Sequence, residues 1–205
     1  AANSTVGYGW LEYETGGSDV RIASNPLVTT NVLDFYSANL PMDSIAVHTI
    51  QGLTSTGKCT WEFGFVWDRD FTENTYEVYM QIGNGSMTTN SPWLGVGPFL
   101  SWAGTGTPTT GRAATAHEMF RVFDDDQSPT EVEVVSGGAN ITVEVDFLSG
   151  NLTLYRNGVG KGSYHFYQKL LTYDRIRFVS DQITPTNIVK RGFDYTRVYL
   201  TIDPN

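Results

Sequence analysis

The fold class is decided by residues 141–158, which read ITVEVDFLSGNLTLYRNG. Apolar and polar residues alternate from Ile141 to Phe147 and again from Leu152 to Tyr155, which is the period of a strand with one buried face. A turn at 149–151 separates the two runs, and the pair Asn157-Gly158 can adopt the positive φ angles of a tight hairpin turn. The segment therefore predicts two consecutive strands and two turns.

The same pattern extends over the rest of the chain and predicts about a dozen strands. Besides 141–147 and 152–155, we expect strands at Tyr8–Tyr13, Val32–Phe35, Ile45–Gln51, Thr60–Asp68, Thr75–Ile82, Leu94–Trp102, Met119–Phe123, Glu131–Val135, Arg175–Val179 and Phe193–Leu200. Only Ala113–Phe120 has helical leanings, because its alanines favour a helix of one or two turns. Two stacked antiparallel sheets accommodate so many short strands most simply. The predicted fold class is all-β, a two-sheet antiparallel β-sandwich.

Composition excludes several classes of protein. Charged residues make up 17% and aromatic residues 13% of the 205 residues, a balance typical of a packed globule, and the length predicts one β-sandwich domain over residues 1–205. The net charge of −9 disfavours a nucleic-acid partner, which requires clustered Lys and Arg. No apolar run reaches the roughly 18 residues that a membrane span needs. We expect an extracellular protein, secreted or displayed on a surface.

Cys59 is the only cysteine, so the chain forms no disulfide within itself. It precedes the alternating aromatic residues Trp61, Phe63 and Phe65, which mark a strand, and we expect a buried structural thiol. Asn-x-Ser/Thr sequons occur at Asn3, Asn84, Asn140 and Asn151. They can carry glycans only in a eukaryotic secretory protein, so they do not decide the location.

The strand pattern is similar to that of a known superfamily. Residues 141–158, the later segment Asp174-Arg-Ile-Arg-Phe178 and the closing Phe193-Asp-Tyr-Thr-Arg-Val198 resemble the late strands of concanavalin A-like lectins and glucanases. The resemblance covers the last third of the chain well and Trp61–Gly85 less well. It implies a jelly-roll sandwich that engages carbohydrate. The superfamily includes lectins, carbohydrate-binding modules, glycoside hydrolases and polysaccharide lyases, and the fold does not choose among them.

The enzymes of this superfamily are matched only in part. Hydrolases carry Glu-x-Asp patterns with a third acidic residue, and Glu144-Val-Asp146 lacks the third. Alginate lyases of this fold use an Arg-rich strand, a Gln-Ile-His strand and a late Tyr. Here Gly83 follows Gln81-Ile82 where His is expected, and Val179-Ser180 stands where Tyr is expected. The alginate-lyase mechanism is therefore not carried over, although a lyase is favoured over a hydrolase if the protein is an enzyme.

A different lyase arrangement remains open. Elimination from a uronate needs a group that neutralises the carboxylate, a base and an acid, and the chain has candidate residues for each role. The carboxylate would be held by polar side chains that alternate outward on neighbouring strands. The base would be a His or Tyr and the acid a Tyr. The candidate catalytic residues are Gln81, Arg175 and Arg177 for the carboxylate, His48 or Tyr79 as base, and Tyr164 or Tyr167 as acid. The alternative interpretation is that the histidines lie on strand surfaces and the tyrosines pack over sheet edges.

A structural Ca²⁺ is implied by the resemblance, since many members of the superfamily hold one with carboxylates and carbonyls. The candidate metal ligands are Asp124, Asp126 and, in the closing strand, Asp194. An acidic turn is the alternative interpretation of Asp124–Asp126. We expect no organic cofactor.

Aromatic side chains are the natural contacts for sugar rings, which stack on them while polar groups fix orientation. The candidate carbohydrate-binding residues are Tyr79, Gln81, Trp93, Trp102 and Arg177. The sequence thus predicts recognition of a polysaccharide or another glycan. Two alternatives are a polysaccharide lyase acting on a uronate glycan and a structural or adhesive module of a fibre, coat or surface assembly.

Overall fold

The computed structural model describes residues 10–14, 19–24, 31–36, 44–67, 76–87, 91–105, 117–134, 139–182 and 191–201, which form fourteen strands and no helix. Sheet A contains, in spatial order, β1 (Trp10–Glu14), β4 (Ser44–Thr54), β13 (Thr172–Gln182), β6 (Tyr76–Gly83), β7 (Val96–Thr105), β8 (His117–Phe123) and β9 (Pro129–Val134). Sheet B contains β12 (Val159–His165), β11 (Asn151–Arg156), β10 (Ala139–Asp146), β5 (Lys58–Trp67), β14 (Arg191–Thr201), β3 (Asn31–Tyr36) and β2 (Asp19–Ser24).

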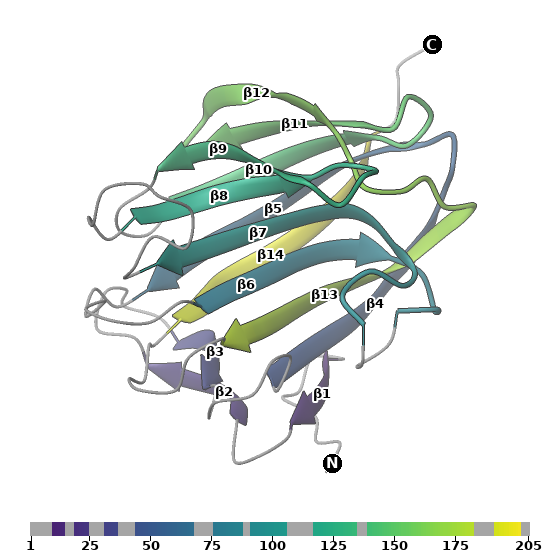
Figure 1. The fold of residues 1–205 in the computed structure, drawn as a ribbon. Helices are drawn as coiled ribbons and strands as arrows, with labels where there is room; N and C mark the ends of the chain where they lie inside the picture. Colours follow the sequence, from purple (N-terminus) through teal and green to yellow (C-terminus); the bar gives the residue numbers. More distant parts are fainter. Residues whose placement is uncertain are drawn as a thin grey trace.

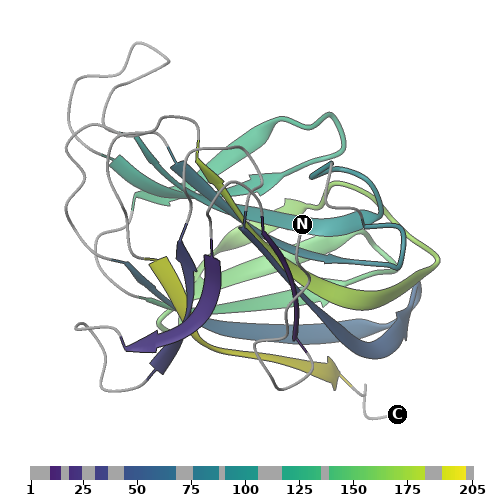
Figure 2. The same ribbon diagram turned by 90° about the horizontal axis from the view of Figure 1, so that it is seen from below.

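All neighbouring strands in both sheets are antiparallel. One sheet lies over the other, with β12 at one end of the molecule and β1, β2 and β3 at the other (Figures 1 and 2). The predicted all-β, two-sheet antiparallel sandwich is confirmed. Within the described ranges, no helix has the length and hydropathy that a membrane span requires.

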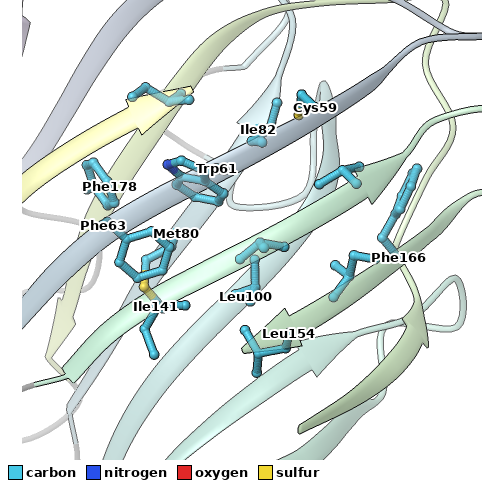
Figure 3. Packing of buried hydrophobic residues seen from close by; sticks show 14 of the residues in the cluster. Cys59, Trp61, Phe63, Met80, Ile82, Leu100, Ile141, Leu154, Phe166 and Phe178 are labelled. Atoms are coloured by element: carbon cyan, nitrogen blue, oxygen red, sulfur yellow. The ribbon is translucent and has the colours of Figure 1, made fainter. Parts of the chain in front are cut away.

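The core lies between the sheets and follows from the alternation in the sequence. In β10, Ile141, Val143 and Val145 are buried, whereas the intervening side chains are exposed or half-buried. Trp61 and Phe63 of β5 face Phe178 of β13, with ring centroids 6.0 and 6.2 Å away (Figure 3). Large rings that span the space between the sheets bury enough apolar surface to hold the two layers together.

The hairpin between β11 and β12 has the predicted geometry. Asn157 and Gly158 have φ angles of 49° and 77°, the left-handed pair that a two-residue hairpin turn requires. The side chain of Asn157 also accepts a 2.9 Å hydrogen bond from the backbone N–H of Asn140. The Asn therefore fixes the turn and ties it to the start of β10.

Two sequence expectations differ from the structure. Residues 117–120 form the start of β8 rather than a helix, because pairing with β7 overrides the weak helical propensity of this segment. Strands β2 and β12 were not predicted. β12 is an edge strand whose side chains are exposed or half-buried throughout, so it lacks the apolar alternation that reveals a strand.

Cys59 is buried in the core, as the sequence predicts, and burial raises the pKa of its thiol to about 12. We expect this thiol to remain unreactive toward a disulfide reagent such as Ellman's reagent at pH 8, because only the thiolate reacts. In guanidinium chloride one thiol per chain should react at the rate of a free cysteine. A fast reaction of the folded protein at pH 8 would contradict the buried position.

Candidate functional site

Gln81 and Arg177 lie side by side on the outward face of sheet A, the face turned away from sheet B. Arg177 is paired in register with Gln81 on one side and with Val47 on the other. The neighbouring residues Met80 and Phe178 point into the core between the sheets, so Gln81 and Arg177 point outward. The sequence prediction that these two side chains share a face on adjacent strands is confirmed.

Both side chains are nevertheless buried. Gln81 is 0% and Arg177 1% exposed. The Nε atom of Arg177 donates a 2.7 Å hydrogen bond to Oε1 of Gln81, and its terminal nitrogen donates to the carbonyl oxygens of Ser91 and Pro92 at 3.3 and 3.2 Å. Nε2 of Gln81 donates to the same Pro92 carbonyl at 2.7 Å. The pair therefore holds residues 91–93 over the sheet.

Burial lowers the pKa of Arg177 to about 10, so the guanidinium remains protonated at neutral pH. A buried cation is tolerated only when acceptors replace the lost water, and here amide and carbonyl oxygens do so. Because the side chain is 1% exposed, this guanidinium is not presented to the carboxylate of a polymeric substrate. We call the arrangement the Arg177 clamp, meaning Gln81, Arg177 and the carbonyls of Ser91 and Pro92.

Above the clamp, aromatic rings cover part of the same face. Phe99 of β7 and Phe123 of β8 lie 4.4 Å apart by ring centroid, and Trp93 contacts them at 4.9 and 5.3 Å. Tyr167 lies 5.2 Å from Trp93. Tyr79 packs edge-on against Phe99 at 5.2 Å and is 9% exposed, which places it beneath the surface rather than on it. Trp93 and Tyr167 are the half-buried members of this group.

The side chain of Gln127, in the turn between β8 and β9, donates a 3.4 Å hydrogen bond to the hydroxyl of Tyr167. No pattern in the sequence indicated that Gln127 lies beside Trp93 and Tyr167, because these three residues come from three separate loops. Gln127 also adopts a positive φ of 67°. An exposed amide thus stands at the edge of two partly exposed rings.

The other candidate catalytic residues do not join the clamp. His48 lies on the inward face of β4, where its ring meets Trp10 at 5.0 Å, so it cannot share a site with Gln81 or Arg177. Tyr164 lies on β12 in sheet B, and its hydroxyl donates to the Lys161 carbonyl at 2.8 Å. The proposed lyase set is therefore not assembled on one surface.

Arg175 is on the outward face of sheet A, two residues before Arg177 in β13. Its Nε lies 3.7 Å from the carboxylate of the adjacent Asp174, and its guanidinium passes over Gly85. The side chain is about one third exposed, which leaves it accessible to solvent. Trp102 lies in β7, but its side chain is outside the described residues.

The calcium prediction stays a prediction. Among the described residues, no three His, Cys, Asp or Glu side chains gather in a group that could hold a metal. Asp124 and Asp126 both accept the backbone N–H of Ser128, at 3.2 and 2.9 Å, as an acidic turn does. The two carboxyl groups share a hydrogen bond, which raises the pKa of Asp124 and lowers that of Asp126. The side chain of Asp194 is outside the described residues.

No family model and no curated protein matches this chain by sequence. Solved structures match it by shape. A sialidase superposes with a TM-score of 0.62 at 13% identity over 93% of this chain, which spans 17% of the sialidase's length. The alginate lyase AlyC3 gives 0.57 at 8% identity, covering 82% of this chain and 75% of the lyase. The carbohydrate recognition domain of Emp47p gives 0.52 at 10% identity, covering 96% and 90%.

The fold is a jelly-roll β-sandwich, as in these solved structures, and this agrees with the predicted concanavalin A-like fold. At identities this low the likeness concerns the fold alone. The Arg177 clamp and the rings of Trp93 and Tyr167 are observed in this chain itself and are not inferred from these structures.

Proposed function

We propose that this concanavalin A-like protein recognises carbohydrate, and that an aromatic platform formed by Trp93 and Tyr167 contacts the sugar. One observation carries the proposal: these two rings are partly exposed and lie 5.2 Å apart, while Phe99 and Phe123 support the ring of Trp93 from below. The apolar C–H face of a sugar ring packs on such a surface, and an adjacent polar group orients it. The amide of Gln127 is such a group.

The Arg177 clamp supports the proposal because it fixes the loop that carries Trp93. The carbonyl of Pro92 accepts hydrogen bonds from both clamp residues, and the backbone N–H of Trp93 bonds to the hydroxyl of Ser91 at 3.3 Å. A ring that is already positioned loses little conformational entropy on binding. The likeness in fold to the Emp47p carbohydrate recognition domain agrees with this role.

The uronate-lyase alternative loses two of its three candidates for holding the substrate carboxylate, because the structure buries Gln81 and Arg177. Arg175 is the one of the three that stays accessible to solvent. An extracellular location accords with carbohydrate recognition and stays a prediction.

Trp93→Ala is expected to weaken glycan binding by about 30-fold, or roughly 2 kcal/mol, because an exposed aromatic anchor commonly contributes this much. The ligand would be found on a glycan array and its affinity measured by calorimetry. Leu94→Ala is the matched control, since Leu94 lies in the same loop, is 54% exposed and offers no ring.

The Leu94 variant should bind like the parent protein, and both variants should keep the parent melting temperature within a few degrees. Equal affinities for Trp93→Ala and the parent protein would contradict the platform. Failure of the parent protein to bind any glycan would contradict carbohydrate recognition itself.

A further inference from the structure

A hollow of about 490 Å³ lies on the outward face of sheet B, on the other side of the sandwich from the aromatic platform. Its volume falls within the range of about 300–1,000 Å³ that is usual for small-molecule sites. The side chains that line it are nearly all polar, and those used below are Lys58, Thr60, Glu144, Asp146, Thr153 and Ser163. The hollow is therefore suited to a ligand rich in hydrogen-bonding groups.

The strand register places these side chains in two rows. In the first row Thr60, Glu144, Thr153 and Ser163 lie next to one another on β5, β10, β11 and β12. In the second row Lys58, Asp146 and Asn151 occupy the positions two residues along. Residues two apart share a face, and strands are spaced by about 4.8 Å, so the rows form a grid of donors and acceptors at short intervals.

Several acceptors of this grid are held in place before a ligand arrives. Oε2 of Glu144 accepts a 3.0 Å hydrogen bond from the hydroxyl of Tyr155, which leaves Oε1 for a ligand. Asp146 accepts the backbone N–H groups of Leu148 and Ser149 at 3.0 and 3.1 Å. The hydroxyls of Thr153 and Ser163 are 2.8 Å apart and bonded to each other. Fixed acceptors reduce the entropy lost on binding.

The charge of the hollow selects among ligands. Two carboxylates and one ammonium line it, in a chain of net charge −9, so a uronate or sulfated glycan would be repelled. A carboxylate accepts strong, charge-assisted hydrogen bonds from neutral hydroxyl groups. We propose that this hollow is a second carbohydrate site, which binds neutral saccharides through their hydroxyl groups. It extends carbohydrate recognition to another surface and does not depend on the platform.

The test is a titration of ¹⁵N-labelled protein with neutral trisaccharides of glucose, mannose and galactose, and with trigalacturonate as the anionic counterpart. At least one neutral trisaccharide should shift the amide resonances of Glu144, Thr153 and Ser163, and trigalacturonate should not. Thr153→Val and Glu144→Gln keep the side-chain shape and should each weaken binding about tenfold. Thr142→Val is the matched control, because Thr142 lies on the same face of β10 but outside the hollow.

The outcomes separate this proposal from the aromatic platform. Trp93→Ala should leave the shifts on sheet B unchanged. Shifts confined to the residues around Trp93, equal weakening by Thr142→Val and Thr153→Val, or a stronger response to trigalacturonate would each overturn the second site. Shifts confined to sheet B would support it and contradict the platform.

Discussion

Gln81→Leu is expected to lower the free energy of unfolding by about 2–4 kcal/mol, although leucine has nearly the same size. The substitution removes the amide oxygen that accepts the 2.7 Å hydrogen bond from Nε of Arg177. It leaves part of a buried, protonated guanidinium without an acceptor, and that cost exceeds the value of one ordinary hydrogen bond. The measurement is equilibrium unfolding in urea.

A double-mutant cycle shows whether the clamp acts as a unit. Arg177→Met should also destabilise the protein, because the carbonyls of Ser91 and Pro92 lose their charged donor. In the double variant Gln81→Leu/Arg177→Met no buried charge remains, so its loss should be smaller than the sum of the two single losses by about 1–3 kcal/mol. Additive losses would show that the two side chains act independently.

The clamp also links stability to the platform. Because Trp93 follows directly on Pro92, Gln81→Leu should weaken glycan binding even at temperatures where the variant is fully folded. Loss of stability with unchanged glycan affinity would show that the clamp supports the sheet but not the binding surface.

Gly83→Ala is expected to destabilise the protein by about 3 kcal/mol or more. Gly83 ends β6 where the chain turns toward β7, and a Cβ there would collide with the carbonyl oxygen of Gly95 and lie 2.8 Å from the sulfur of Met87. The same Gly95 carbonyl accepts a 2.9 Å hydrogen bond from the N–H of Asn84, which closes the loop. A backbone atom cannot rotate away as a flexible side chain can, so the loop must open.

Gly57→Ala is the matched control for this prediction. A Cβ at Gly57 would meet its nearest atoms at 3.6 Å, an ordinary van der Waals distance, so the change should stay within about 1 kcal/mol. The two variants would be compared by thermal and urea unfolding. Equal stabilities for Gly83→Ala and Gly57→Ala would contradict the close approach of the two backbone segments.

Much of the fold could be predicted from the sequence, because alternation reports directly which side of a strand is buried. The run from Ile141 to Phe147 and the Asn157-Gly158 turn carry this signal within a few residues. The edge strand β12 carries none, since neither of its faces is buried. Pattern reading therefore misses this edge strand, although pairing with β11 makes it part of sheet B.

The candidate sites were less accessible to sequence reasoning. Alternation correctly placed Gln81 and Arg177 on one face, but it could not show that residues 91–93 cover them. It also could not show that His48 faces the core beside Trp10.

The sequence by itself determined most of the strands, the tight turn and the buried thiol of Cys59, because each depends on neighbours a few positions away. Only the tertiary structure decided what covers the clamp, which rings stand at the surface and which polar residues of β5, β10, β11 and β12 meet across sheet B. Each of these arrangements brings together residues that are far apart in the chain. They result from strand pairing and loop packing, which the local periodicity of the sequence does not predict.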